Sequence, residues 1–219
     1  MTRWVIAFLV CASGATLLAQ VPDAKTIASR VDHHYNSLHS LSVAFSESYE
    51  GMGIHRAESG TLLLRKPGRM RWVYSEPKGK LFVLDGKYAY FYTPGDAQAQ
   101  RINAKQLDDL RSPLRFLLGH TELMKELDGL KASAGTEDGV YVLTGAPKGG
   151  AGSGSAHLSR LALSVTADGT IRAMKIEEED GSTTNFSFTN EVPNSPVTDA
   201  DFIFRAPQGV TVVEGLPPV

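Results

Sequence analysis

At four places an Asp-Gly dipeptide separates short runs rich in β-branched and aromatic residues, and this pattern limits the possible folds more than any other feature of the chain. They are Asp85-Gly86, Asp138-Gly139, Asp168-Gly169 and Asp180-Gly181. An Asp-Gly pair suits a tight hairpin turn of type I′, because both central residues of that turn need a positive φ. Since hairpins pair strands that follow one another in sequence, the chain is predicted to form a meandering antiparallel sheet.

The strands of this sheet are indicated by the alternation of apolar and polar residues. Leu41, Val43 and Phe45 alternate with small residues, which is typical of a strand with one buried face. Further strands are expected over residues 60–66, 69–75, 80–84, 87–93, 130–136, 141–144, 158–166, 171–178 and 183–189. The predicted sheet therefore contains about ten strands and is expected to be curved.

Two segments have a helical pattern instead. Residues 23–38 carry Ile27, Val31 and Tyr35 at near-helical spacing, with Asp23 as the expected N-cap. Residues 103–127 are rich in leucine and are predicted to form two or three short helices inserted between strands. An antiparallel sheet needs cover on its apolar face, so these helices are expected to supply it.

Within the leucine-rich insertion, Ser112-Pro113 is a typical helix start and Gly119 a typical stop. Residues 147–155, rich in Gly and Ser, are predicted to be a flexible loop inside one domain rather than a linker, because strands continue on both sides. The sequence contains no internal repeat that would indicate a second domain.

The first 19 residues have the features of an export signal. Arg3 precedes an uncharged stretch that ends in small residues, and cleavage is expected after Ala19, with Ser13-Gly14-Ala15 as an earlier candidate. One alternative is a transmembrane anchor, but the stretch is shorter than the roughly 20 apolar residues needed to span a bilayer. Another is lipid attachment at Cys11, which has too short an apolar stretch before it. Residues 20–219 are expected to form one exported domain.

Composition argues against several classes of function. Lys and Arg number 22 against 24 Asp and Glu, so no basic field favours nucleic acid as a partner. The single cysteine lies in the export segment, which excludes disulfides and thiol chemistry in the remaining chain. Neither the Gly-x-Ser-x-Gly nucleophile motif nor a phosphate-binding glycine loop occurs. No catalytic residue and no cofactor is predicted.

Metal sites are not predicted either. His33 and His34 are adjacent on the first helix and point about 100° apart, which does not suit two ligands of one metal ion. Both are expected to be solvated surface residues. The acidic run from Glu177 to Asp180 lacks the spacing of a calcium loop and is interpreted as an exposed hairpin.

Aromatic side chains concentrate in the first half of the predicted sheet. Two strands each carry three large side chains on one face, namely Met70, Trp72 and Tyr74, and Tyr88, Tyr90 and Tyr92. Phe91 lies on the opposite face of the second strand. An ordinary hydrophobic core explains this pattern, and so does a cavity for an apolar ligand roofed by the leucine-rich insertion. The residues alone leave both interpretations open.

A series of short motifs follows in a fixed order between residues 58 and 210. They are Gly60, Arg65-Lys66-Pro67, Trp72, Pro77, Asp85-Gly86-Lys87, Tyr90-Phe91-Tyr92-Thr93-Pro94, Ser112-Pro113, Asp199 to Phe204, and Pro207 to Val210. In order and spacing they resemble the LolA family of periplasmic outer-membrane lipoprotein carriers. The segment from Asp199 to Val210 matches the closing strand of that family.

This resemblance implies an incomplete, half-open β-barrel with a helical lid, whose apolar interior holds the acyl chains of lipoproteins. It implies a periplasmic carrier and no catalysed reaction. The implied partners are acylated lipoproteins, an inner-membrane ATP-driven lipoprotein-releasing transporter and, where one exists, an outer-membrane acceptor similar to LolB. A monomer is expected. Alternation and resemblance together assign the cavity to Leu62, Leu64, Met70, Trp72, Tyr74, Tyr90, Tyr92, Leu114, Leu117 and Leu118.

One departure from the family concerns the lid. The resemblance implies that an arginine before the strand-ending proline latches the lid, and here the matching residue is Lys66, with Arg65 one place earlier. Alternation puts Lys66 on the face of Leu62 and Leu64 and puts Arg65 on the other face. Lysine cannot form the planar fork of a guanidinium. We expect Lys66 to bond oxygen acceptors on residues 103–127, with Arg65 as the alternative latch.

Two other functions are compatible with parts of this pattern. A periplasmic module that senses lipids or lipoproteins could use the same half-barrel, although such proteins usually carry a second domain. A secreted lipid hydrolase would need a nucleophile motif that this sequence lacks. The carrier is therefore the preferred hypothesis from the sequence.

Overall fold

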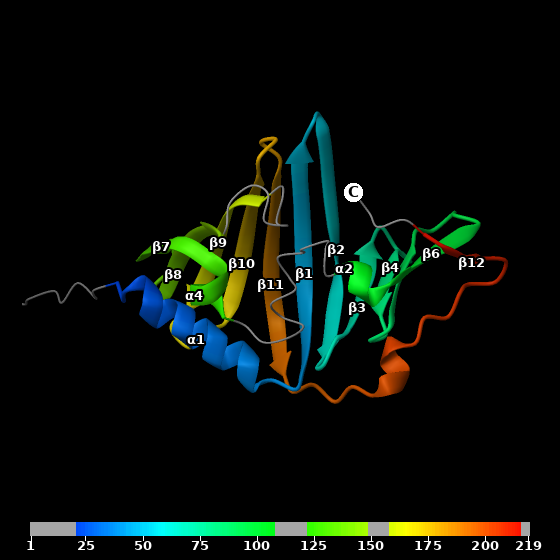
Figure 1. Cartoon of the computed structure of the whole chain (residues 1–219), viewed down its shortest axis with the longest axis horizontal. Coiled ribbons are helices and arrows are strands. Elements are labelled where there is room, and N and C mark those ends of the chain that lie inside the picture. The colour runs from blue at the N-terminus through cyan, green and yellow to red at the C-terminus, as the bar shows by residue number, and fades with distance from the viewer. Residues whose placement is uncertain (1–20, 108–121, 149–157, 216–219) are drawn as a thin grey trace, which may run out of the picture.

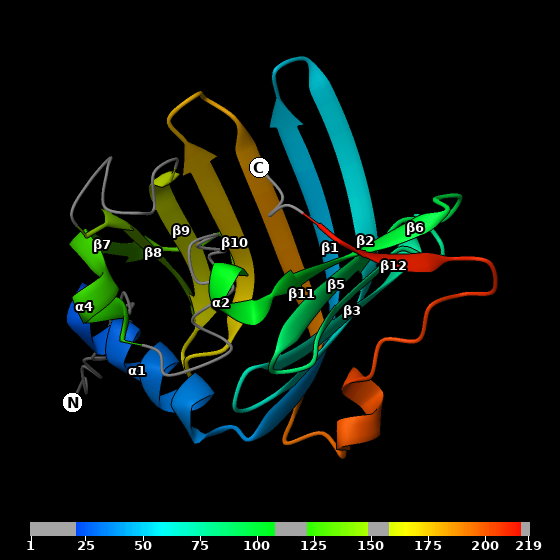
Figure 2. The ribbon, with the colours of Figure 1, turned by 45° about the vertical axis from the view of Figure 1, so that its right-hand side comes forward.

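A single curved sheet dominates the structure, a computed structural model that describes residues 21–107, 122–148 and 158–215 (Figure 1). Its strands are β1 (Ser40–Gly51), β2 (Ile54–Arg65), β3 (Arg69–Glu76), β4 (Leu81–Leu84), β5 (Tyr88–Tyr92), β6 (Gln98–Asn103), β7 (Leu127–Ala134), β8 (Val140–Pro147), β9 (Leu158–Thr166), β10 (Ile171–Glu178), β11 (Thr183–Pro193) and β12 (Thr211–Glu214). The order across this 12-stranded sheet is β12-β6-β5-β4-β3-β2-β1-β11-β10-β9-β8-β7. The sheet is open, with β12 and β7 at its edges (Figure 2).

The predicted meander is confirmed, because β1 to β6 and β7 to β11 are antiparallel neighbours in chain order, and β1 pairs with β11 to join the two runs. The predicted type I′ turn is wrong at all four sites, since none of Asp85, Asp138, Asp168 and Asp180 has a positive φ. Instead, the Gly169 amide donates to the Thr166 carbonyl at 3.0 Å. Such a three-residue loop needs a positive φ at its glycine alone.

Two strands, β6 and β12, are absent from the sequence prediction. In β6 the buried residues Ala99 and Ile102 lie three positions apart, so they face opposite sides and produce no alternation. β12 is a short edge strand that runs parallel to β6, which makes the sheet mixed. The closing strand expected from Asp199 onward is wrong in its first part, because Asp199–Phe202 forms the 3-10 helix η1.

The helix α1 (Ala24–Ser37) forms as predicted. Its N-cap is Asp23, whose carboxylate accepts a hydrogen bond from the Thr26 amide at 2.9 Å. Its buried stripe includes Ile27, Val31 and Tyr35, and the helix packs against α4 (Leu123–Glu126), β7 and β8. α4 and α2 (Ala104–Leu107) are the described parts of the predicted helical insertion. The export segment, residues 1–19, lies outside the described residues.

The hairpin between β9 and β10 reaches the backbone of α1 at Gly169. A Cβ atom at this position would lie 2.3 Å from the carbonyl oxygen of Arg30, and the φ of Gly169 is +96°. Gly139, in the hairpin between β7 and β8, also has a positive φ of +75°, but a Cβ there would meet nothing within 4 Å. The two glycines therefore separate the cost of backbone strain from the cost of losing a close contact with α1.

We expect Gly169→Ala to lower the free energy of unfolding by about 3 kcal/mol, because it adds a steric clash with α1 to the strain of a positive φ. Gly139→Ala, the matched control, should cost about 1 kcal/mol, since it adds strain alone. Urea unfolding followed by circular dichroism measures both. Equal losses in the two variants would show that α1 does not pack tightly on this hairpin.

Candidate functional site

The apolar residues of the sheet gather mainly on one face, the face that α1 covers, which we call the inner face (Figure 2). Alternation places Leu41, Val43 and Phe45 of β1 on this face, and all three are buried. They form one continuous hydrophobic cluster with Ile27 and Val31 of α1. The curved sheet therefore presents a long apolar surface that helices cover at one end.

Aromatic rings line the inner face in the middle of the sheet. The ring of Trp72 lies edge-on to that of Phe45, with centroids 4.5 Å apart, and 6.1 Å from that of Phe186. Strand pairing places Leu62, Trp72, Phe82 and Phe91 in one row across four strands. We call the side chains of this row, together with Phe45 and Phe186, the aromatic wall. The indole N–H of Trp72 is the one polar group of that side chain, and it donates to the sulfur of Met70 at 2.8 Å.

Five of the predicted cavity residues lie on this face. Leu62, Leu64, Met70 and Trp72 are buried, and Tyr74 is half-buried against Phe45 with ring centroids 5.3 Å apart. Their assignment as acyl-chain contacts stays a prediction. The predicted lid residues Leu114, Leu117 and Leu118 lie outside the described residues.

Placing Tyr90 and Tyr92 on this wall is wrong. Tyr90 pairs with Val83 and Arg101 on the opposite, outer face, where its ring stacks on Phe204 at 4.9 Å. Tyr92 shares this outer face, since it lies two residues along the same strand. Phe91 points inward instead and contacts Phe82, with centroids 4.8 Å apart. The register of the β4–β5 hairpin decides which residue faces inward, because it pairs Phe91 with Phe82 and Tyr90 with Val83.

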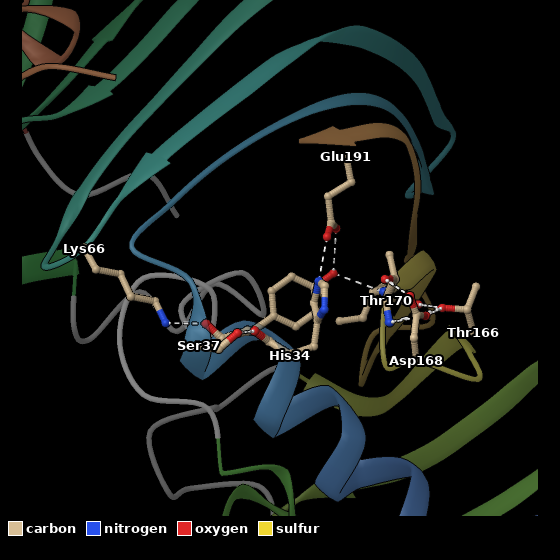
Figure 3. Close-up of polar contacts among 9 residues, drawn as sticks. His34, Ser37, Lys66, Thr166, Asp168, Thr170 and Glu191 are labelled. Atoms are coloured by element: carbon tan, nitrogen blue, oxygen red, sulfur yellow. Dashed lines mark hydrogen bonds and ion pairs between the residues drawn. The ribbon is translucent and has the colours of Figure 1, made fainter. Parts of the chain in front are cut away.

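The strand end at Lys66 contacts α1. The Lys66 ammonium donates to the backbone carbonyl of Tyr35 at 2.6 Å (Figure 3). This carbonyl belongs to the last turn of α1, where it also accepts the amide of the C-cap residue Leu38 at 3.3 Å and where the helix dipole favours a cation. Burial lowers the pKa of the Lys66 ammonium. Among the described residues, the expected acceptor on residues 103–127 is therefore replaced by α1.

Arg65 points to the other side of the sheet, as alternation predicts. Its guanidinium bonds the carboxylate of Asp199 at the start of η1. Both groups are well exposed, so this ion pair adds little to stability. The opposite orientations of Lys66 and Arg65 make the two residues a natural pair for comparison.

A second set of polar contacts joins α1 to β11. The His34 imidazole nitrogen Nε2 lies 2.6 Å from a carboxylate oxygen of Glu191, and the Tyr35 hydroxyl donates to the other oxygen at 3.1 Å (Figure 3). The Tyr35 hydroxyl also accepts the Ile171 amide at 3.0 Å. These groups, together with Lys66, form what we call the α1 clamp. The expectation that His34 is a solvated surface residue is wrong, since its side chain is only 17% exposed.

The clamp changes the acid–base properties of its members. The hydrogen bond to Glu191 raises the pKa of His34, although burial opposes this effect. Burial and the nearby Glu191 carboxylate raise the pKa of the Tyr35 hydroxyl, which stays protonated and can donate. Folding therefore favours the imidazolium form of His34 more than the unfolded chain does.

Little space remains between the clamp and the sheet. A void of about 10 Å³ lies among Tyr35, Leu41, Val43, Ile171, Met174, Phe188 and Glu191. This is close to the minimum that holds one water molecule and is far too small for an acyl chain. Binding of a large apolar ligand on this part of the inner face therefore requires side chains or α1 to move.

Among residues 21–107, 122–148 and 158–215, no group of three or more His, Cys, Asp or Glu side chains could hold a metal ion. In the same part of the chain, every helix is too short or too polar to cross a membrane. The described inner face offers apolar contacts, and the α1 clamp adds hydrogen bonds at its margin.

A raised pKa at His34 predicts a specific pH dependence. The stabilisation from protonated His34 is complete below the unfolded pKa of about 6.5 and is lost as the pH rises through the higher folded value. Between pH 6 and pH 8, the free energy of unfolding should fall by about 1 kcal/mol more in the wild type than in His34→Gln. Urea unfolding across this range measures the difference, with His33→Gln as an exposed neighbouring control. Identical pH profiles for wild type and His34→Gln would contradict the role of the clamp.

Comparison with known proteins places this fold in a family. The family model described as "Outer membrane lipoprotein carrier protein LolA" matches residues 36–205. An outer-membrane lipoprotein carrier protein from Photorhabdus laumondii is 30% identical over 177 residues, covering 81% of each chain. Another, from Cupriavidus necator, is 26% identical over 93% of this chain and 95% of that protein.

A solved structure of an uncharacterized conserved protein from Thermus thermophilus shares the fold, with a TM-score of 0.56 and 14% identity over 88% of this chain and 99% of that one. The family match extends from the end of α1 through all strands except β12, and includes both the aromatic wall and Lys66. The chain belongs to the LolA family of outer membrane lipoprotein carrier proteins.

Proposed function

We propose that this protein is a periplasmic carrier that holds the acyl chains of lipoproteins against its inner face and moves them from the inner to the outer membrane. The observation that carries the proposal is the continuous apolar surface formed by the aromatic wall and the α1-covered residues on an open sheet. Membership of the LolA family supports the same function.

The energetics of lipid burial suit such a surface. Each methylene group removed from water contributes about 0.8 kcal/mol, so one chain of roughly 16 carbons contributes on the order of 12 kcal/mol. An acylated protein cannot cross an aqueous compartment unless the apolar surface of its acyl chains is covered. An apolar face left open without cargo would itself be a liability for aggregation. A carrier therefore needs a binding face that closes when it is empty.

In the proposed mechanism the structure represents a closed state. The inner face is packed, and α1 is held by Lys66 and by the His34–Glu191 contact. Loading separates α1 from part of the sheet, and each hydrogen bond broken costs about 1 kcal/mol, a small fraction of what acyl burial supplies. The clamp thus makes closure favourable without cargo and reversible with it.

The remaining parts of the proposal follow from family membership and from the sequence. Residues 1–19 direct export, an ATP-driven transporter in the inner membrane loads the carrier, and an acceptor in the outer membrane receives the cargo. The proposed acyl-contact residues are Leu62, Leu64, Met70, Trp72, Tyr74, Phe82 and Phe91, with Leu114, Leu117 and Leu118 as lid residues. The proposed cycle contains no covalent step and needs no cofactor.

Neighbouring residues of β5 test whether the inner face binds apolar ligands. Phe91 points to the aromatic wall and Tyr90 to the outer face, and both are half-buried. We expect Phe91→Asp to weaken binding of an apolar fluorescent probe at least tenfold, because a carboxylate on the wall must be desolvated. Tyr90→Asp should leave affinity within about twofold of the wild type. Probe titration and displacement by a purified lipoprotein measure both, after circular dichroism has confirmed folding. Loss of binding in Tyr90→Asp alone would place the ligand on the outer face.

The clamp is tested by Lys66→Leu, with Arg65→Leu as its matched control. Lys66→Leu removes the bond to α1 and adds apolar lining, so the closed state should lose about 1 kcal/mol relative to the loaded state. Cargo should then leave about fivefold more slowly when a labelled lipoprotein is transferred to outer-membrane acceptors. Arg65→Leu should transfer at the wild-type rate. Normal transfer in Lys66→Leu together with slow transfer in Arg65→Leu would identify Arg65 as the latch.

A further inference from the structure

Four charged side chains lie at the end of the aromatic wall away from α1, and the proposed acyl-binding role does not use them. They are Glu47 of β1, Arg56 and Glu58 of β2, and Lys80 from the turn before β4, and we call them the charged cluster. Glu47 follows Val43 and Phe45 on the inner face, and strand pairing sets it directly opposite Glu58. The cluster therefore continues the wall toward the tip of the β1–β2 hairpin.

The contacts within the cluster are unequal. The Lys80 ammonium donates to both carboxylate oxygens of Glu58 at 2.6 Å, and Arg56 Nε lies 3.5 Å from one of them. Glu47 has a weaker ion pair, with Arg56 Nη2 at 3.6 Å. The side chains of Glu58 and Glu47 are only 5% and 11% exposed, whereas that of Arg56 is 51% exposed. A buried and a largely buried carboxylate thus share two cations, the half-buried Lys80 and the exposed Arg56.

The cluster adjoins the aromatic rings directly. The Lys80 ammonium lies 4.5 Å from the centre of the Tyr74 ring, and that ring is 5.3 Å from Phe45. On the other neighbouring strand of β1, which is β11, the residue paired with Glu47 is Phe186. A chain lying along the aromatic wall would therefore bring its polar end to these four side chains.

Retaining these charges beside an apolar surface is costly. Burying a carboxylate costs several kcal/mol unless strong partners compensate, and apolar residues of similar size often stabilise a fold better. Glu58 is compensated by Lys80, but burial and the facing Glu58 carboxylate raise the pKa of Glu47. The Glu47 carboxyl group thus has a weak ion-pair partner, and the Arg56 guanidinium has several N–H donors, so both groups can form further hydrogen bonds with a ligand.

We propose that the charged cluster binds the polar head of the lipid anchor, the ester- and amide-bearing glyceryl-cysteine that joins the acyl chains to a lipoprotein. Arg56 donates to ester carbonyl oxygens, and the Glu47 carboxyl group pairs with the amide or amine nitrogen of the cysteine. This inference rests on the proposed carrier function and adds a recognition site to it. It also gives the cargo a direction, because the attached protein leaves near the tip of the β1–β2 hairpin.

The test compares two ligands on the same purified protein. One is a synthetic diacylglyceryl-cysteine lipopeptide, and the other is an apolar fluorescent probe without ester or amide groups. We expect Arg56→Gln and Glu47→Gln to weaken lipopeptide binding about tenfold and to change probe binding less than twofold. The matched control is Arg160→Gln in β9, because Arg160 forms a similarly loose ion pair with Glu177 at 4.0 Å, and alternation places it on the outer face. It should change neither affinity.

Each result supports or overturns the proposal. Lipopeptide affinity within twofold of the wild type in both variants overturns the head-group site and leaves the carrier function intact. Equal losses for lipopeptide and probe also overturn it, because they show general damage to the wall. If the wild type binds neither ligand, the carrier function itself fails, and the head-group site fails with it.

Discussion

The structure depends on covering one apolar face of an open sheet. The strands from β1 to β11 all supply buried residues to the same hydrophobic cluster on the inner face, and that face is too large to be left in water. α1 covers only part of it, packing on α4, β7 and β8. The apolar surface that stabilises the fold is therefore the same surface that we propose for acyl chains, so an empty and a loaded carrier must bury it in different ways.

Polar contacts decide how α1 is held. Packing of Ile27 and Val31 is not directional, but the bonds from Lys66 to the last turn of α1 and from His34 to Glu191 define one position of the helix. Each of these bonds is worth about 1 kcal/mol, whereas acyl burial offers on the order of ten times more. This difference in scale allows cargo to displace the helix without unfolding the sheet.

The chemical character of the inner face changes from one end of the strands to the other. Near α1 it is aliphatic, in the middle it is aromatic around Trp72, and toward the β1–β2 tip it carries Glu47 and Glu58 with their cations. A lipid anchor has the same order of parts, with hydrocarbon chains at one end and a polar head at the other. The proposed orientation of cargo follows from this match.

By itself the sequence determined the elements: the hairpins at Asp-Gly pairs, the α1 stripe with its Asp23 cap, and the shared face of Met70, Trp72 and Tyr74. These depend on local turn geometry and on the periods of helix and strand. Only the tertiary structure decided that Tyr90 faces outward, that His34 pairs with Glu191, and that β6 and β12 exist. Alternation defines two faces of a strand without saying which is inner, and a partner more than a hundred residues away leaves no local pattern.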